Sequence, residues 1–145
     1  MPTLFTIGYE KLLPAELLAE LQHAGVRRVI DVRFRPQSRR AGMSKTRLKE
    51  LLESHGIAYE HRRELGTPAD IRPLFHQGKL AEAAAAYTEH VTQNAPEALD
   101  ELANELDGAP PTALLCLEAE PAGCHRRVIT DELGKRRDDL EVVDL

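Results

Sequence analysis

The sequence has few cysteines and no long apolar run, and both absences narrow the class of protein. Its 145 residues include only two cysteines, Cys116 and Cys124, which are too few for the disulfide framework of a small secreted domain. No stretch approaches the roughly 20 apolar residues that a membrane-spanning helix needs. The first residues lack the basic start and apolar core of a signal peptide. We therefore expect a cytoplasmic protein with reduced cysteines and no membrane partner.

Several signatures of cofactor and metal sites are also absent. The sequence has neither the Gly-x-Gly-x-x-Gly pattern of dinucleotide sites nor the Gly-x-x-x-x-Gly-Lys-[Ser/Thr] pattern of P-loops. It contains no Cys-x-x-Cys or His-x-x-x-His pair, and the adjacent Cys124 and His125 would struggle to share one ion. The compact loops that begin at the reactive cysteine of phosphatases and rhodaneses are missing as well. We expect no cofactor and no metal ion.

The net charge of −5 conceals an uneven distribution of charge along the chain. Residues 27–49 carry nine of the nineteen Lys and Arg residues but only one acid, Asp31, whereas residues 80–107 carry seven acids and no Lys or Arg. The overall sign argues against a general nucleic-acid coat protein but leaves a local basic site open. The acidic segment is typical of a solvated face. It could instead meet the basic segment of a second copy, so a homodimer is an alternative.

Apolar segments that suit strands alternate with segments of helical periodicity. Strands are predicted at residues 4–8, 27–33, 57–61, 112–118 and 140–145. Helices are predicted at residues 14–25, 44–56, 80–94, 96–108 and 127–136. Residues 62–79 are interrupted by glycines and prolines and form a segment longer than an ordinary loop between two elements. This segment could hold one short helical turn.

Parallel strands need helical crossovers, and this alternation supplies them. We therefore predict a single α/β domain over residues 1–145, with a three-layer αβα fold and a mostly parallel sheet of about five strands. Residues 112–118 form the most continuous apolar run. They are expected to be the central strand, buried on both faces.

Polar side chains follow four of the predicted strands. In an open α/β sheet, ligands bind beyond the carboxyl ends of the strands, so we expect these side chains to line one shared site. The candidates are Tyr9 after the first strand, Asp31, Arg33, Arg35 and Arg39 after the second, His61 at the end of the third, and Cys116, Glu118, Cys124, His125 and Arg126 after the fourth.

Arginine is the most prominent residue type in this predicted site. Guanidinium groups match phosphate and carboxylate groups bidentately, and the start of a helix also favours an anion. We predict that an anion is bound by Arg33, Arg35, Arg39 and Arg126, with a solvated basic loop as the alternative.

Three further residues of the predicted site would support a bound anion or its partners. Asp31 and Glu118 would orient the guanidinium groups, and Asp31 could instead serve as an acid–base group. Tyr9 could stack on a base or cap the core.

Cys124 is the candidate nucleophile of the site. It stands near a predicted helix start, where backbone N–H groups and nearby cations stabilise a thiolate and lower its pKa below about 8.5. His125 is the candidate base, and His61 is a second candidate. The alternative is that Cys124 simply fills a turn. Cys116 is expected to be a buried small apolar residue.

Four segments of the sequence resemble one protein family. These are "TIGYE", "VIDVRFRPQSRRAGMSK", "AYEHRRELG" and "LLCLEAEPAGCHR", and together they are similar to the bacterial and archaeal family called domain of unknown function 488. The resemblance extends over nearly the whole chain. It implies an α/β fold and a shared polar site, without naming a reaction.

The residues support one leading function and two alternatives. The leading hypothesis is a pocket at the carboxyl edge of the sheet that binds or acts on a phosphate-bearing ligand, such as a nucleotide or a nucleic-acid end. One alternative is a non-catalytic nucleic-acid-binding module that uses Arg27 to Lys49. The other is a thiol-based redox protein. Whether the protein is an enzyme stays open.

Overall fold

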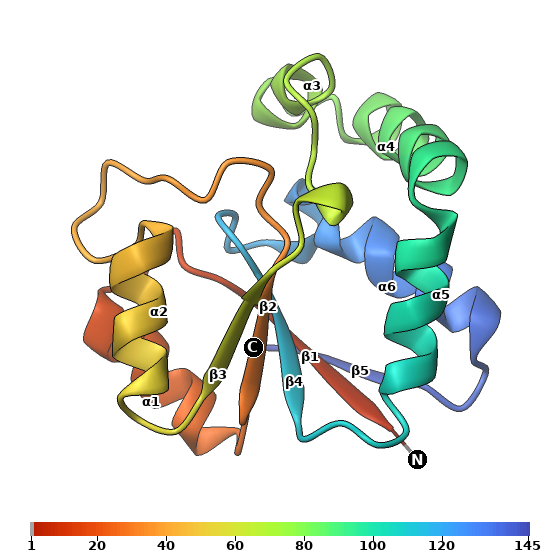
Figure 1. Cartoon of the computed structure of the whole chain (residues 1–145). Helices are drawn as coiled ribbons and strands as arrows, with labels where there is room; N and C mark the ends of the chain where they lie inside the picture. The colour runs from red at the N-terminus through yellow and green to blue at the C-terminus, as the bar shows by residue number, and fades with distance from the viewer. Residues whose placement is uncertain (1) are drawn as a thin grey trace.

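The computed structural model describes residues 2–145, in which strands and helices alternate (Figure 1). The strands are β1 (Thr3–Gly8), β2 (Arg28–Asp31), β3 (Ala58–His61), β4 (Thr112–Cys116) and β5 (Glu141–Asp144). The helices are α1 (Pro14–His23), α2 (Lys45–Glu53), α3 (Arg72–His76), α4 (Leu80–Asn94), α5 (Pro96–Glu105) and α6 (Arg126–Arg136). Two short 3-10 turns are η1 (Arg63–Leu65) and η2 (Pro121–Gly123). No helix within the described part is long and apolar enough to cross a membrane.

The five strands form one parallel sheet in the order β3-β2-β4-β1-β5. Strand β4 lies in the middle, and all five of its residues are buried, which confirms that the longest apolar run is the central strand. Gly8 at the end of β1 lies opposite Cys116, and Asp31 at the end of β2 lies opposite Leu115. The carboxyl ends of the three inner strands therefore meet at one edge.

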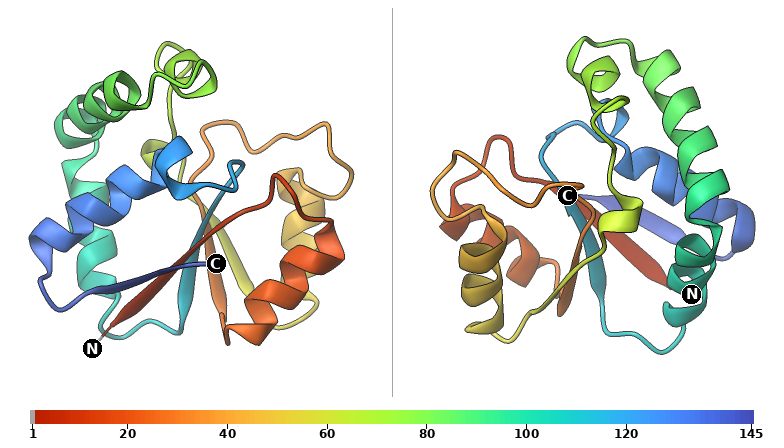
Figure 2. Two further views of the ribbon diagram at one scale, coloured as in Figure 1. Left: turned by 180° about the vertical axis from the view of Figure 1, so that it is seen from behind. Right: turned by 45° about the horizontal axis from the view of Figure 1, so that its top comes forward.

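Helices cover both faces of the sheet, as Figures 1 and 2 show. Helices α1 and α2 bury their leucines against one face, which also receives Ile7 and Leu115. Helices α4, α5 and α6 cover the other face, which receives Leu4 and Leu114. Alternate residues of β1 and β4 thus feed two separate apolar clusters, as strand geometry requires. The predicted α/β fold with three layers is confirmed.

The ends of α1 and α2 follow from local chemistry. The carboxylate of Glu16 accepts the backbone N–H of Leu13 at 2.8 Å at the start of α1. Beyond the ends of α1 and α2, Gly25 and Gly56 both have a φ of 77°, a left-handed conformation that glycine adopts most readily. These two glycines are the predicted stops of the two helices.

The long segment between β3 and α4 is held by tertiary contacts. The hydroxyl of Tyr87 on α4 donates to the carbonyl oxygen of Leu65 at 2.5 Å. Helix α3 follows and lies above the edge at which the strands end (Figure 1). Its five residues are the short helical turn expected in this segment.

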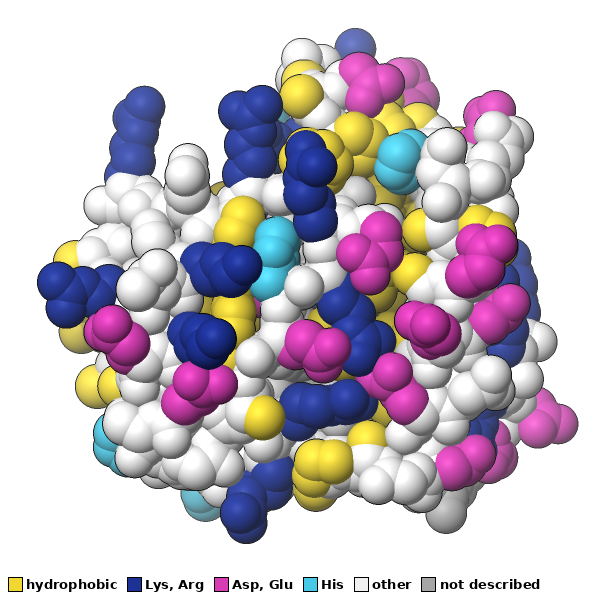
Figure 3. Space-filling view, in the orientation of Figure 1, with side chains coloured by type: hydrophobic (Ala, Val, Ile, Leu, Met, Phe, Trp, Pro, Cys, Tyr) yellow, Lys and Arg dark blue, Asp and Glu magenta, His cyan; other side chains and the backbone are white. Residues whose placement is uncertain are grey.

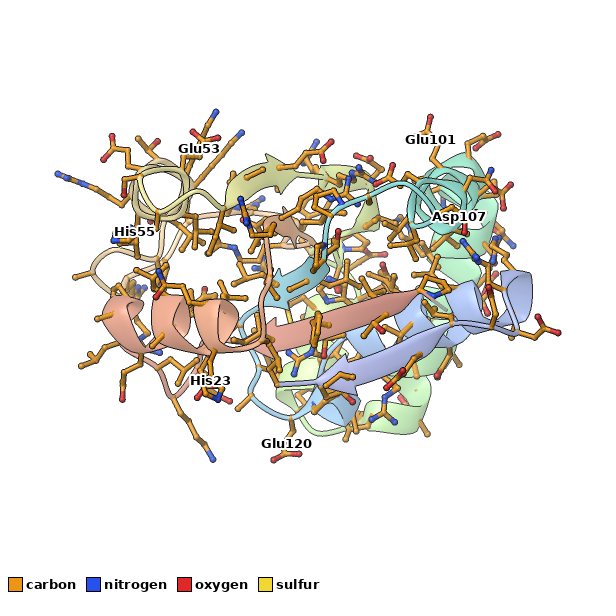
Figure 4. All side chains as sticks on the ribbon, turned by 90° about the horizontal axis from the view of Figure 1, so that it is seen from below. His23, Glu53, His55, Glu101, Asp107 and Glu120 are labelled. Atoms are coloured by element: carbon orange, nitrogen blue, oxygen red, sulfur yellow. A yellow bond between two sulfur atoms is a disulfide. The ribbon has the colours of Figure 1, made fainter. Side chains whose placement is uncertain are left out.

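The outward faces carry charged and polar side chains. Glu101 and Asp107 point outward from α5 and from the residues after it, and His23 and His55 lie at the periphery near the ends of α1 and α2 (Figure 4). All four are exposed, and none of them lines the pocket at the carboxyl edge that is described below.

The end of β1 has no room for a side chain at Gly8. A Cβ atom there would lie 1.7 Å from the carbonyl oxygen of Glu118 and 2.7 Å from Nη1 of Arg126. We predict that Gly8→Ala lowers the free energy of unfolding by about 3 kcal/mol or more, because backbone as well as side chain must move. Urea denaturation measures this change.

Gly108→Ala is the matched control. A Cβ atom at Gly108 meets no atom within 4 Å, so its effect should stay within about 0.5 kcal/mol. Equal stability of the two variants would contradict the close packing described for Gly8.

Candidate functional site

A pocket lies at the carboxyl edge of the sheet, where the segments after β1, β2 and β4 meet α3 and the start of α6. Its volume is about 110 Å³, which equals the space of roughly four water molecules at about 30 Å³ each. Seven of the residues predicted from the sequence line it: Tyr9, Arg33, Arg35, Cys116, Glu118, Cys124 and His125.

Four other predicted site residues do not line the pocket. Asp31 and Arg126 are fully buried beneath it. Arg39 is exposed on the segment between β2 and α2. The Nε2 atom of His61 lies 2.7 Å from the carbonyl oxygen of Arg33, and His61 lines a separate open groove beside Glu105.

Arg33 is held by an ion pair that is closed to water. Its Nε donates to Asp31 Oδ1 at 2.9 Å and its Nη2 to Asp31 Oδ2 at 2.7 Å. Its Nη1 donates to the carbonyl oxygen of Met43 at 2.7 Å and to the hydroxyl of Tyr9 at 3.2 Å. Burial alone would lower the pKa of Arg33, but the hydrogen bond and charge of Asp31 raise it above its usual value. Arg33 thus fixes the protein's own segments, and its N–H groups are directed at protein acceptors.

Asp31 and Tyr9 are fixed by the same ion pair. Tyr59 donates its hydroxyl to Asp31 Oδ2, and burial followed by the charge of Asp31 raises the pKa of Tyr59. The Arg33 guanidinium lies over the ring of Tyr9 at 5.3 Å from its centroid. Tyr9 is only 2% exposed, so its ring packs on Arg33 and leaves little surface on which a base could stack.

Arg126 ties together the elements below the pocket. It is 0% exposed. Its Nε donates to Thr6 Oγ1 at 3.1 Å, its Nη1 to the sulfur of Cys116 at 3.0 Å and to the carbonyl oxygen of Glu118 at 2.5 Å, and its Nη2 to the carbonyl oxygen of Ala119 at 3.0 Å. Burial lowers the pKa of this guanidinium. The predicted anion-binding residue is therefore enclosed by protein acceptors and does not face the pocket.

Glu118 contributes its backbone to Arg126 and its side chain to the rim of the pocket. Its carboxylate lies 4.0 Å from Nε2 of His76 on α3. Burial raises the pKa of the Glu118 carboxyl, although His76 and Arg126 oppose this effect. The orientation of Arg126 thus comes from the main-chain oxygen of Glu118.

The structure joins Cys116 and Cys124 in a disulfide at the bottom of the pocket. The expectation of two reduced cysteines is wrong for this structure, because the end of β4 and the end of η2 place the two sulfurs in contact. Each cysteine is 1% exposed. The backbone N–H of Arg126 also points to the sulfur of Cys124 at 3.5 Å.

His125 is a buried imidazole that faces Cys124. Its Nε2 lies 2.7 Å from the carbonyl oxygen of Val32, and its Nδ1 lies 3.6 Å from the sulfur of Cys124. A carbonyl oxygen only accepts, so Nε2 carries the proton and Nδ1 presents a lone pair toward the sulfur. Burial lowers the pKa of His125 to about 4. The imidazole is therefore neutral at physiological pH, with the lone pair of Nδ1 toward the sulfur.

Three potential metal ligands also meet at the bottom of the pocket. One ligand atom each from Cys116, Glu118 and Cys124 lies within 4.8 Å of the others. The sequence has no paired Cys or His motif that would have predicted this set, because its members come from different elements. Zinc would require both sulfurs as thiolates. Here they bond to each other, and the Arg126 guanidinium points at one of them.

Sequence reasoning missed the wall of the pocket that α3 and the residues before it provide. Thr67, Arg72, Phe75 and His76 line this wall. Eight arginine side chains have hydrogen-bond or ion-pair partners within the described chain: Arg28, Arg33, Arg40, Arg62, Arg126, Arg127, Arg136 and Arg137. Arg35 and Arg72 have no such partner among residues 2–145. The unusual length of the segment was the only signal in the sequence.

Residues 14–133 match the model of a family described as "Domain of unknown function DUF488". The chain belongs to this family. The match confirms the resemblance, and it includes every pocket residue except Tyr9. The chain has no significant match among curated proteins or among solved structures.

The buried ion pair of this DUF488 chain leads to a prediction about stability. Asp31→Ala leaves the Arg33 guanidinium without its carboxylate in a site closed to water. We predict that it lowers the free energy of unfolding by about 3–5 kcal/mol. Asp107→Ala is the control, because Asp107 is exposed and pairs with Arg137 at 2.7 Å; its cost should be about 0–1 kcal/mol. Denaturant titration measures both changes in the free energy of unfolding. Equal changes in the two variants would contradict the assignment of a buried ion pair.

The lowered pKa of His125 predicts a specific dependence of stability on pH. The unfolded chain binds a proton at this residue below about pH 6.5, whereas the folded protein binds it only below about pH 4. The contribution of His125 to the free energy of unfolding is therefore complete above about pH 6.5. It is lost as the pH falls from about 6.5 to about 4. It amounts to about 3 kcal/mol over the whole window.

His125→Gln should remove this part of the pH dependence, and His55→Gln at an exposed position should retain it. Imidazole NMR should show His125 with the proton on Nε2 at neutral pH. A native titration near pH 6.5 would show that the side chain is not buried as described.

Proposed function

We propose that this pocket binds the phosphate group of an anionic ligand through Arg35 and Arg72. The observation that supports the proposal is that both residues line the same pocket and that their guanidinium groups have no hydrogen-bond or ion-pair partner among residues 2–145. Guanidinium groups bind phosphate oxygens bidentately through charge-assisted hydrogen bonds. Arg35 comes from the segment after β2 and Arg72 from α3, so they approach a ligand from two sides.

Thr67 supports a polar ligand independently of the two arginines. Thr67 lines the same pocket, and its hydroxyl oxygen is buried without a hydrogen-bond partner among the described residues. Leaving a buried hydroxyl unpaired costs about 1–3 kcal/mol. A phosphate oxygen in the pocket would accept a hydrogen bond from this hydroxyl and remove that cost.

The size of the pocket supports a ligand that enters with one end. A volume of about 110 Å³ suits a phosphate group and a few attached atoms, and it is smaller than the roughly 300–1,000 Å³ of sites that enclose drug-sized ligands. The remainder of a nucleotide, or of a strand with a terminal phosphate, would lie outside the pocket. Phe34, Phe75 and Leu117 offer apolar surface for the atoms next to the phosphate.

The cations of residues 27–49 favour a nucleic-acid-binding module as the second candidate. Three of these cations serve the protein itself: Arg28 pairs with Glu105, Arg33 is buried, and Arg40 donates to backbone carbonyls after β1. The remaining six are exposed. Figure 3 shows cationic side chains along the upper edge and acidic ones gathered on the side of α4 and α5.

A thermal-shift titration with three probes tests the proposal. Inorganic phosphate and a nucleoside 5′-monophosphate should raise the melting temperature, and the matching nucleoside should not. Arg35→Gln and Arg72→Gln should each weaken phosphate binding by about tenfold or more, because a charge-assisted hydrogen bond contributes about 1.5–3 kcal/mol. Arg39→Gln is the matched control, since Arg39 belongs to the same segment as Arg35 but does not line the pocket.

Two results would contradict the phosphate site. One is the absence of any shift with phosphate, and the other is an equal loss of binding in the Arg39→Gln variant. Equal binding of 5′-phosphorylated and 5′-hydroxyl oligonucleotides, with affinity falling steeply as salt rises, would favour the second candidate instead.

A further inference from the structure

The disulfide between Cys116 and Cys124 lines the pocket and also belongs to the apolar cluster under α4, α5 and α6. Its two sulfurs have different neighbours. The sulfur of Cys116 receives an N–H of the Arg126 guanidinium at 3.0 Å. The sulfur of Cys124 faces the Nδ1 lone pair of the neutral His125 at 3.6 Å. A cation beside one sulfur and a proton acceptor beside the other are the groups that thiol–disulfide exchange uses.

We propose that Cys116 and Cys124 are a redox-active pair that exchanges with a small anionic thiol entering the pocket. The exchange itself rests on the sulfurs and their neighbours. The preference for an anionic thiol rests on the phosphate site proposed above, because Arg35 and Arg72 would hold the negative group of the entering molecule.

The environment of each sulfur determines the direction of the reaction. The thiolate of the entering molecule attacks the sulfur of Cys124, the bond between the two protein sulfurs breaks, and Cys116 leaves as a thiolate beside Arg126. A thiolate leaves faster when its charge is stabilised, and the guanidinium of Arg126 donates to the sulfur of Cys116 at 3.0 Å. Attack at Cys116 would instead release a thiolate at Cys124, which has only a backbone N–H and a neutral imidazole beside it.

A second molecule of the small thiol completes the exchange. It also reacts as its thiolate, after releasing its proton to water, and attacks the small-molecule sulfur of the mixed disulfide. Cys124 then leaves as a thiolate, and the two protein thiolates take up from water the two protons that the small thiols released. The protein disulfide gains two electrons and two protons and becomes a dithiol, and the two small thiols become one small disulfide.

The depth of the sulfurs restricts the partner to a small molecule. Both cysteines are 1% exposed and are reached only through a pocket of about 110 Å³. A small molecule can enter such a pocket whole, whereas a cysteine of another protein would have to bring its backbone to the rim of the pocket. Mercaptoacetate, which carries a thiol and a carboxylate on two carbons, fits these limits and serves as the probe.

The first experiment compares three thiols of similar size on the oxidised wild-type protein. Mercaptoacetate is anionic, 2-mercaptoethanol is neutral and cysteamine is cationic. Alkylation after denaturation, followed by mass spectrometry, counts the thiols formed. All three should convert the protein from no free thiols to two, and mercaptoacetate should react faster at equal thiolate concentration, by about tenfold or more, through the cations of the pocket.

The variants Arg35→Gln and Arg72→Gln separate the two proposals. Both should lose the rate advantage of mercaptoacetate over 2-mercaptoethanol, whereas Arg39→Gln, at a residue that does not line the pocket, should retain it. Equal rates for the three thiols in the wild type would overturn the anionic preference, and with it support for the phosphate site, while the exchange itself would stand.

Two single-cysteine variants test the assigned roles. Cys124→Ser leaves the Cys116 thiol beside Arg126, and Cys116→Ser leaves the Cys124 thiol beside His125. The pH dependence of alkylation should give Cys116 the lower pKa, below the ordinary value of about 8.5. Rapid alkylation of the wild type during reduction should yield protein alkylated at Cys116 with the small thiol on Cys124; the reverse pattern would overturn the assigned direction.

Two outcomes in the wild-type protein would overturn the redox pair. One is a disulfide that none of the three thiols reduces unless the protein is denatured, which would make it a structural cross-link. The other is a purified protein with two cysteines that resist the disulfide of mercaptoacetate and retain zinc, which would assign Cys116, Glu118 and Cys124 to a metal site.

Discussion

A guanidinium group without access to water holds the centre of the carboxyl edge together. Arg126 is charged and fully buried, so each of its nitrogens must find an acceptor within the protein. The acceptors come from β1, from β4 and from the turn that follows β4. Meeting this requirement draws the turn down onto Gly8, where only a residue without a Cβ fits. The bottom of the pocket is the surface that this closure leaves.

The fold was predictable because the periodicity of apolar residues, and the glycines and prolines that end helices and strands, are local properties of the sequence. Alternating apolar segments marked every strand, and helix periodicity with Gly25 and Gly56 as stops marked α1 and α2. The rule that ligand sites lie beyond parallel strands also located the pocket. Local pattern could not give the strand order, and for α3 it gave only one short helical turn somewhere within residues 62–79. That helix has five residues, and it is placed by α4 and the preceding segment rather than by its own propensity.

The roles of individual arginines were not predictable, because they depend on distant partners. Arg33 and Arg35 are two residues apart and look equivalent in the sequence. Arg33 is taken up by Asp31, whereas Arg35 lines the pocket without a partner in the described chain. Arg126 is likewise directed at acceptors far away in the sequence. Arg72 came from a segment that offered no chemical signal. The same limitation hid the disulfide, because spacing alone does not bring two sulfurs into contact.

The cations of the site lie at two depths, and this separation connects the two proposals. Arg35 and Arg72 line the pocket and are open to a ligand, while Arg126 lies beneath the sulfurs. An anionic thiol brings one negative charge on its acid group, and the charge of its thiolate passes to Cys116 when that sulfur leaves. In a small pocket these charges would repel each other unless each has its own cation. The rim arginines and the buried one provide that separation. His125 stays neutral through burial, so it adds no third charge beside Cys124.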